Sequence, residues 1–340
     1  MNSGFRGSDS RSDVQFSHTR KAGEMDLQAA LEEYRYAVLD LTPKTRIWYE
    51  QKLRRFGEWC QGEYAKSRPG DIPVDAVHAT MVRRFLEEYR TTPTHKRKLP
   101  STYTTKGYAQ VIKGFFIWCD REGISPDMVG KRIRLPRVET KVIEIFSPEQ
   151  LKRLFAACKQ EPYSTLQYRD RAMLALLLGT GIRANELCTL TMDRLFLDTS
   201  HPKNSYVRVK GKGRKEREIG LPVSAVEHIA RYIRRYRVAD EFMWEVFLGR
   251  KRIPITPNGL DQWMERLGDW AGITGVRCSP HTLRHTFSVN FLVQGGDLFV
   301  LSRILGHTSV ATTQIYLQAM SQQQVRQTSF SVLDYINERR

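Results

Sequence analysis

Residues 172–187 read AMLALLLGTGIRANEL, and this stretch decides the architecture of the second half of the chain. Ala172–Leu178 is apolar on every side, which predicts a helix buried at the centre of a domain. The Gly179-Thr180-Gly181 triplet ends that helix, and a new helix follows that carries Arg183 and Glu186. We therefore expect a helical domain built around this segment.

The position of Arg183 has two interpretations. An arginine at the N-terminus of a helix can bind a phosphate together with the free backbone N–H groups there. Alternatively, Arg183 forms an ion pair with Glu186, three residues further along the same helix. This segment alone leaves both interpretations open.

Upstream of this domain, the sequence predicts a small helical domain over about residues 25–122. Its four helices are expected at about 25–39, from Pro43 with Thr42 as N-cap, at about 75–92, and from Ser101 onward. In the second helix, one face carries the apolar residues Tyr49, Leu53, Phe56 and Cys60. Residues 1–24 are rich in Ser, Gly, Asp and Arg, and they predict a flexible tail.

A basic linker is predicted over residues 123–146, between the helical domain and a second domain at 147–340. Its cations are Lys131, Arg132, Arg134, Arg137 and Lys141. They suit either a solvated connector or a segment lying along a phosphate backbone. The second domain begins with a capping box, Ser147-Pro148-Glu149-Gln150.

A hairpin interrupts the helices of this second domain. Tyr206–Lys210 and Arg217–Leu221 alternate like strands around Gly211-Lys212-Gly213. The hairpin region is strongly basic, with Lys203, Arg208, Lys210, Lys212, Arg214, Lys215 and Arg217. The predicted fold class is therefore mainly α with a small antiparallel β-sheet.

The charge balance indicates the class of partner. The 340 residues carry a formal net charge of +17, which favours nucleic acid, or second an anionic membrane surface, as partner. No apolar stretch approaches the ~20 residues that span a bilayer, and the first residues lack the apolar core of a secretory signal. Five scattered cysteines without a CxxC pair suit a reducing cytoplasm and no structural zinc.

Two further segments carry candidate chemistry. His281 and Arg284 share a helix face in HTLRHTF, His307 follows Gly306, and Tyr316 lies nine residues later. A zinc site from His281, His285 and His307 is disfavoured, because no carboxylate accompanies them and the adjacent arginine would repel a cation. The candidate residues instead suit the binding of a phosphate that a tyrosine attacks: they are two arginines, two histidines and a hairpin lysine. A phenol is a weak nucleophile, so it needs such positively charged groups around the phosphate.

The order Arg, hairpin Lys, His-x-x-Arg, Gly-His and Tyr resembles the tyrosine recombinase family, the lambda-integrase type that includes phage integrases and Xer recombinases. The resemblance is strongest over about residues 147–317. The matching residues are Arg183, Lys212, His281, Arg284, His307 and Tyr316. It implies a SAM-like, core-DNA-binding helical domain followed by a catalytic domain.

The resemblance also implies an activity: site-specific recombination through a 3′-phosphotyrosyl intermediate, without metal, cofactor or ATP. Tyr316 would attack, and Arg183 and Arg284 would hold the phosphate. His281 and His307 would assist proton transfer and positioning, and Lys212 would protonate the leaving 5′-oxygen. If Lys212 is not the general acid, Lys210 or Lys215 would be the candidate for that role. Further DNA contacts are expected from Arg132, Arg134, Arg137, Lys210, Arg214 and Lys215.

The implied partners are double-stranded recombination sites and other copies of the chain, as a dimer on each site and a tetramer in the synapse. An accessory DNA-bending or directionality factor would also fit. The apolar residues within 328–340 are expected to dock on a neighbouring protomer, or alternatively to fold back on their own domain. The implied location is the cytoplasm, in association with the nucleoid, and not a membrane.

Two rival functions are compatible with the same residues. A type IB topoisomerase would use the same phosphotyrosine chemistry, and a DNA-binding architectural protein would keep the fold without the reaction. The integrase-like helical domain favours a recombinase over the first rival. The complete set of six candidate residues argues against the second.

Overall fold

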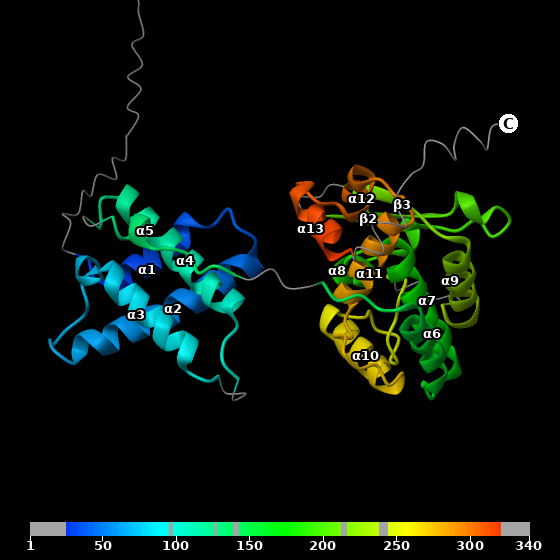
Figure 1. Cartoon of the computed structure of the whole chain (residues 1–340), viewed down its shortest axis with the longest axis horizontal. Helices are drawn as coiled ribbons and strands as arrows, with labels where there is room; N and C mark the ends of the chain where they lie inside the picture. Colours follow the sequence, from blue (N-terminus) through cyan, green and yellow to red (C-terminus); the bar gives the residue numbers. More distant parts are fainter. Residues whose placement is uncertain are drawn as a thin grey trace, which may run out of the picture. The chain divides into compact units, whose positions relative to one another are not determined.

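The computed structural model describes residues 25–94, 98–125, 128–138, 143–211, 216–237 and 244–320. The chain divides into two compact units, Met1–Thr140 and Lys141–Arg340, and each is described here by itself (Figure 1). The predicted tail at 1–24 and the predicted docking segment at 328–340 lie outside the described residues.

The first unit is helical in the part of it that the structure describes. Its helices are α1 (Leu27–Ala37), α2 (Pro43–Ala65), α3 (Ala79–Thr91), α4 (Thr102–Arg121) and the short α5 (Val129–Arg132). The predicted caps of α2 and α4 are confirmed, because the Thr42 and Ser101 hydroxyls each accept a backbone N–H three residues on. The segment expected as one helix at 75–92 instead begins with a 3₁₀ turn, Val74–Ala76. Val77 is extended and buried there, so α3 starts later.

Aromatic rings fill the core of the first unit. Leu53, Phe56 and Cys60 of the predicted apolar face are buried, and Tyr49 packs against them. The Phe56 ring lies 5.2 Å from Phe85, centre to centre, in an edge-to-face arrangement that suits aromatic pairs. The apolar period of α2 therefore predicted its buried face correctly.

Both ends of the segment predicted as a linker contribute to a core. Val129 and Ile133 are buried in the first unit, and a Cβ on Gly130 would lie 2.6 Å from the Ile117 backbone nitrogen, so α5 can approach α4 only with glycine there. At the other end, Phe146 is buried in the second unit, and its backbone N–H donates to Thr286 Oγ1 at 3.0 Å.

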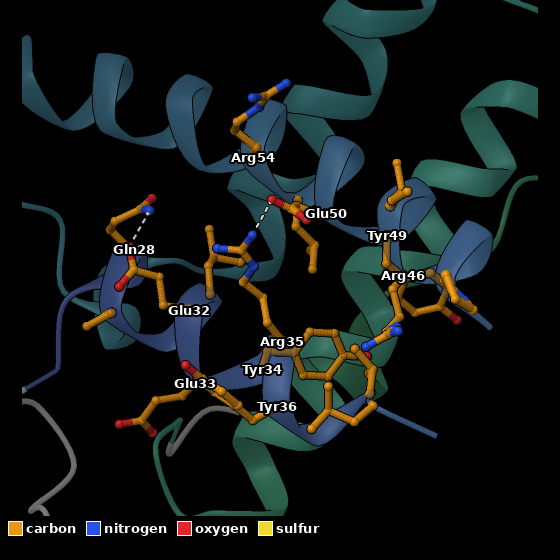
Figure 2. Close-up of a pocket in the computed structure, with 17 residues that line it drawn as sticks. Gln28, Glu32, Glu33, Tyr34, Arg35, Tyr36, Arg46, Tyr49, Glu50 and Arg54 are labelled. Atoms are coloured by element: carbon orange, nitrogen blue, oxygen red, sulfur yellow. Dashed lines mark hydrogen bonds and ion pairs between the residues drawn. The ribbon is translucent and has the colours of Figure 1, made fainter. Parts of the chain in front are cut away.

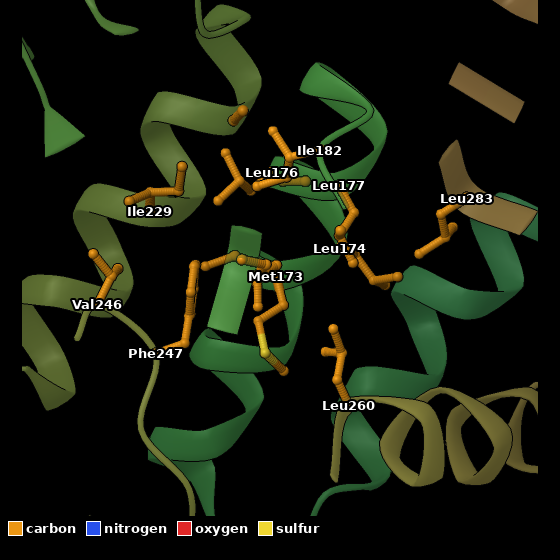
Figure 3. Packing of buried hydrophobic residues seen from close by; sticks show 14 of the residues in the cluster. Met173, Leu174, Leu176, Leu177, Ile182, Ile229, Val246, Phe247, Leu260 and Leu283 are labelled. Atoms are coloured by element: carbon orange, nitrogen blue, oxygen red, sulfur yellow. The ribbon is translucent and has the colours of Figure 1, made fainter. Parts of the chain in front are cut away.

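The second unit is built around one buried helix. Its helices are α6 (Pro148–Ala157), α7 (Ser164–Thr180), α8 (Ala184–Cys188), α9 (Val223–Tyr236), α10 (Pro257–Trp270), α11 (Pro280–Val293), α12 (Leu298–Leu305) and α13 (Ala311–Ala319). As predicted, α7 is buried on nearly all sides, and it packs against α9 and α11. Figure 3 shows Met173, Leu174, Leu176 and Leu177 of α7 among side chains from the surrounding elements.

A three-stranded antiparallel sheet completes this unit, in the order β1 (Leu195–Phe196), β2 (Tyr206–Lys210) and β3 (Glu216–Gly220). The predicted hairpin is confirmed, with its second strand one residue earlier than expected. Buried Val207 faces buried Ile219, while on the other side of the sheet Arg208 pairs with Glu218 at 2.8 Å. The two-residue strand β1 is too short to show an alternating pattern in the sequence.

The described residues contain no helix that is long and apolar enough to cross a bilayer.

Candidate active site

The turn after α7 positions the first candidate arginine. Gly181 has a left-handed backbone (φ +62°), and a Cβ there would lie 2.3 Å from Cδ1 of Phe287. Only glycine fits this turn, because both the backbone angle and the space exclude a side chain. The chain then reverses into α8, with Arg183 as its N-cap residue.

Arg183 is held by a buried carboxylate. Its Nη1 donates to Glu186 Oε1 at 3.0 Å, and its Nη2 donates to the Gly306 carbonyl at 3.2 Å. Arg217 of β3 donates to both Glu186 oxygens, at 2.9 and 2.8 Å. Burial raises the pKa of Glu186, but hydrogen bonds from Arg217 and Arg183 outweigh it and hold that pKa below its usual value. The ion pair considered for Arg183 is thus confirmed, and the Arg183 side chain remains 35% exposed.

Arg284 of α11 is almost completely buried, with 4% of its surface exposed. Its Nη1 donates to the Gly181 carbonyl at 2.5 Å, and its Nη2 donates to the Leu305 carbonyl at 2.9 Å and faces His307 Nε2 at 3.0 Å. Burial and the neighbouring Arg183 lower the pKa of Arg284 to about 10, so it stays charged at neutral pH. Arg284 therefore joins the turn after α7 to the end of α12.

The hydrogen bonds of His307 define its tautomer. A guanidinium can only donate, so the Nε2 atom that faces Arg284 is an acceptor, and the proton lies on Nδ1. Nδ1 donates to Thr313 Oγ1 at 2.8 Å, from α13. Burial and the cations Arg284, Arg183 and Arg217 lower the pKa of His307 to about 4, so the ring is neutral.

Tyr316 lies on α13 and is 2% exposed. Its ring packs in a small apolar cluster with Val289, Leu292, Leu301 and Leu305. Its hydroxyl lies 3.2 Å from Nδ1 of His285, a contact that the sequence did not predict.

His281 occupies the first turn of α11, which begins at Pro280 and is capped by the Ser279 hydroxyl, the acceptor of the Thr282 N–H. Its side chain is exposed and makes no hydrogen bond to another described residue. Partial desolvation and the nearby Arg284 lower its pKa. It is the exposed histidine of the candidate set.

The hairpin loop is described only in part. Lys210 is exposed at the end of β2, near Glu186 and Arg208 in a small hollow. Lys212, Arg214 and Lys215 lie outside the described residues.

In the first unit, Arg132, Arg134 and Arg137 are all exposed. None of them forms an ion pair with another described residue. They are therefore available to an anionic partner.

The structure shows contacts that the sequence analysis left open or did not predict. Arg217 and Glu186 fix Arg183, Thr313 orients His307, and His285 contacts Tyr316. The HTLRH run offered a signal for His285, but only as a metal ligand. Among the described residues, no group of three His, Cys, Asp or Glu side chains could hold a metal ion.

A groove of about 810 Å³ lies elsewhere, between α1 and α2 of the first unit (Figure 2). It is lined by both charges and apolar side chains, including the ion pair of Arg35 with Glu50 at 2.5 Å. None of the candidate catalytic residues lines it.

A family model matches about half of this chain, and a curated relative matches most of it. Residues 144–323, just over half of the chain, match the phage integrase family. The tyrosine recombinase XerD of Vibrio cholerae is 32% identical over 290 residues, which cover 81% of this chain and 86% of that protein.

Two solved structures share the fold. The XerH site-specific recombinase bound to palindromic difH substrate gives a TM-score of 0.68 at 20% identity, covering 89% of this chain and 84% of that one. The Tn1549 transposon integrase in complex with a circular intermediate DNA gives 0.67 at 18% identity, covering 89% and 98%. The family match and the XerD relative establish that the chain belongs to the phage integrase family of tyrosine recombinases, which cleave and rejoin DNA at specific sites.

Proposed function

We propose that this recombinase uses Tyr316 as nucleophile and a phosphate pocket of Arg183, Arg284, His281 and His307. The observation that carries this assignment is the contact of Arg284 with His307, at 3.0 Å, beside the contact of Arg183 with Gly306. Three segments that are far apart in the sequence therefore bring two guanidinium groups and the His307 imidazole close together. Lys212 would join them from the hairpin loop.

In the reaction proposed, the phenol oxygen of Tyr316 forms a bond to phosphorus and the bond from phosphorus to the 5′-oxygen breaks. Arg183 and Arg284 stabilise the negative charge that grows on the non-bridging oxygens. Lys212 gives its proton to the leaving 5′-oxygen. The energy of the broken ester is kept in the phosphotyrosine, so rejoining needs neither ATP nor metal.

His307 would change its partner when a phosphate binds. In the structure its Nε2 accepts from Arg284, so this nitrogen has no proton to offer. A bound phosphate adds negative charge beside the ring, which favours its protonated form. His307 could then donate from both nitrogens, to Thr313 and to the phosphate.

The partner proposed is a pair of double-stranded recombination sites. DNA is also the partner of XerH, bound to difH substrate, and of the Tn1549 integrase, in complex with a circular intermediate DNA. Exchanging both strands of two duplexes requires four cleavages. Each chain carries one Tyr316, so we infer a dimer on each site and a tetramer in the synapse. This assembly would carry out integration or excision of a mobile element, or Xer-like resolution. The reaction would take place in the cytoplasm, with or without an accessory DNA-bending or directionality factor.

Covalent capture tests the proposal. Purified protein is incubated with fragmented DNA of its source genome, denatured, and recovered with the DNA that remains attached. We expect attachment through the 3′-phosphate at a few defined sequences. Recovery of no attached DNA, or of attachment through 5′-ends, would contradict the mechanism.

The exposed arginines at 132, 134 and 137 predict a salt dependence of binding. If they contact phosphates, the triple glutamine variant should lower the slope of log affinity against log salt by up to about three units on a captured site. The control replaces Lys66, Arg84 and Arg90, whose charges are already paired with glutamates of the same unit. If both triple variants changed the slope equally, only net charge would matter and the 132–137 segment would be a solvated connector.

A further inference from the structure

The partner of the Tyr316 hydroxyl is a histidine outside the family-derived catalytic set. Nδ1 of His285 lies 3.2 Å from the Tyr316 oxygen, and the two rings are 5.6 Å apart, centre to centre. This is hydrogen-bonding distance. The proposed mechanism requires the Tyr316 hydroxyl to lose its proton, and His285 is the residue that the structure places within hydrogen-bonding distance of it.

The contact is built by two packed helices. α13 lies against α11 and α12 (Figure 1). Thr313 and Tyr316, three residues apart on α13, meet His307 and His285 respectively. The same helix that orients the neutral imidazole of His307 therefore also places the phenol against His285.

We propose that His285 accepts the proton of Tyr316 during cleavage and returns it during rejoining. This rests on the proposed function, because it takes Tyr316 as the nucleophile. As the phenol oxygen bonds to phosphorus, its O–H bond breaks and the proton moves to Nδ1 of His285. In rejoining, the 5′-hydroxyl attacks, its proton returns to Lys212, and the departing phenolate recovers the proton from His285.

The protonation state of His285 suits this role. Burial, His281 and Arg284 lower its pKa, so the ring is neutral at pH 7 and one nitrogen has a free lone pair. His281 and Arg284 act from its own helix, and Tyr316 faces it from α13. The carboxylate of Asp261, on α10, acts to raise the pKa of His281.

The other two histidines are placed less well to take this proton. His307 uses Nε2 to accept from Arg284 and Nδ1 to donate to Thr313. His281 is exposed and makes no hydrogen bond to Tyr316. Removal of a positioned proton acceptor costs about 10²–10⁴-fold in rate.

The test measures single-turnover cleavage of a nicked duplex made from a captured site, with full-length protein. One duplex has the natural 5′-oxygen at the cleaved bond, and the other has sulfur there, which leaves without a proton. We expect His285→Phe to cleave both duplexes at least about 100-fold more slowly than the wild type. Lys212→Ala, by contrast, should be slow on the oxygen duplex and largely restored on the sulfur duplex.

The pH profile gives a second readout that loss of packing would not produce. Without its proton acceptor, cleavage by His285→Phe should rise about tenfold per pH unit from pH 6.5 to 8.5, because hydroxide must then remove the phenol proton. The wild-type rate should level off over the same range. His285→Ala with added imidazole should recover part of the rate, and exposed His201→Ala is the matched control that should cleave normally.

The outcomes separate the two proposals. Wild-type adducts together with an unchanged His285→Phe rate and pH profile would overturn the role of His285 alone. Sulfur rescue of His285→Phe would place this histidine on the leaving-group side and would also overturn it. Absence of adducts from the wild type, or adducts formed by a Tyr316→Phe variant, would instead overturn the assignment of Tyr316.

Discussion

Tyr316→Phe should eliminate covalent attachment to DNA, with a loss of roughly 10⁴-fold or more in cleavage, because the attacking oxygen is removed. The phenylalanine ring keeps the packing against Val289, Leu292, Leu301 and Leu305. DNA affinity should change little, and the free energy of unfolding should change by only about 1 kcal/mol, the usual net worth of one hydrogen bond. Denaturing gels with labelled captured-site duplex, together with thermal melts, measure the two effects.

Tyr232→Phe is the matched control. Its buried hydroxyl donates to the Val246 carbonyl at 3.1 Å and accepts the Leu248 N–H at 3.2 Å, in the core of the same unit. This variant loses more hydrogen bonds than Tyr316→Phe, so it should be the less stable of the two and still form adducts. A covalent band from Tyr316→Phe would move the nucleophile to another residue.

Local sequence signals predicted the helix starts well. Thr42-Pro43, Ser101, and Ser147 with Gln150 each mark a helix start where the structure has one. These signals work because a cap depends on hydrogen bonds within four residues of the chain. The helix predicted at 75–92 carried no such cap signal and was placed too early, because a 3₁₀ turn and the extended, buried Val77 precede α3.

Contacts between distant segments could not be predicted in this way. The Arg183–Glu186 pair was an open alternative because it spans three residues, but the second partner of Glu186, Arg217, comes from a strand 31 residues away. The contact of His285 with Tyr316 depends on how α13 packs on α11, which no short motif encodes. The family resemblance supplied the set of six residues, while the structure supplies what orients them.

Arg284→Lys should combine a large loss of rate with a loss of stability. Lysine has one point charge in place of the fork that reaches Gly181, Leu305 and His307 together. Each buried carbonyl left without its donor costs about 1–3 kcal/mol. Loss of a charged donor to the reacting phosphate should slow cleavage by about 10²–10³-fold.

A second buried arginine separates the two effects. Arg169 donates to Asp170 at 2.6 Å and to the Leu248 carbonyl at 3.3 Å, within the same unit, and it is as well buried as Arg284. Arg169→Lys should therefore lower the melting temperature to a similar extent. Below that temperature, however, it should cleave captured-site duplex at close to the wild-type rate.

Comparing the two variants decides what Arg284 contributes. If Arg169→Lys and Arg284→Lys lost cleavage in proportion to their loss of stability, Arg284 would act only as a tie between the end of α7 and the end of α12. If only Arg284→Lys lost cleavage, its guanidinium would act on the phosphate itself. We expect the second result, because Arg284 contacts His307 and lies near Arg183 and Arg217, so that cations from three separate segments converge at this place.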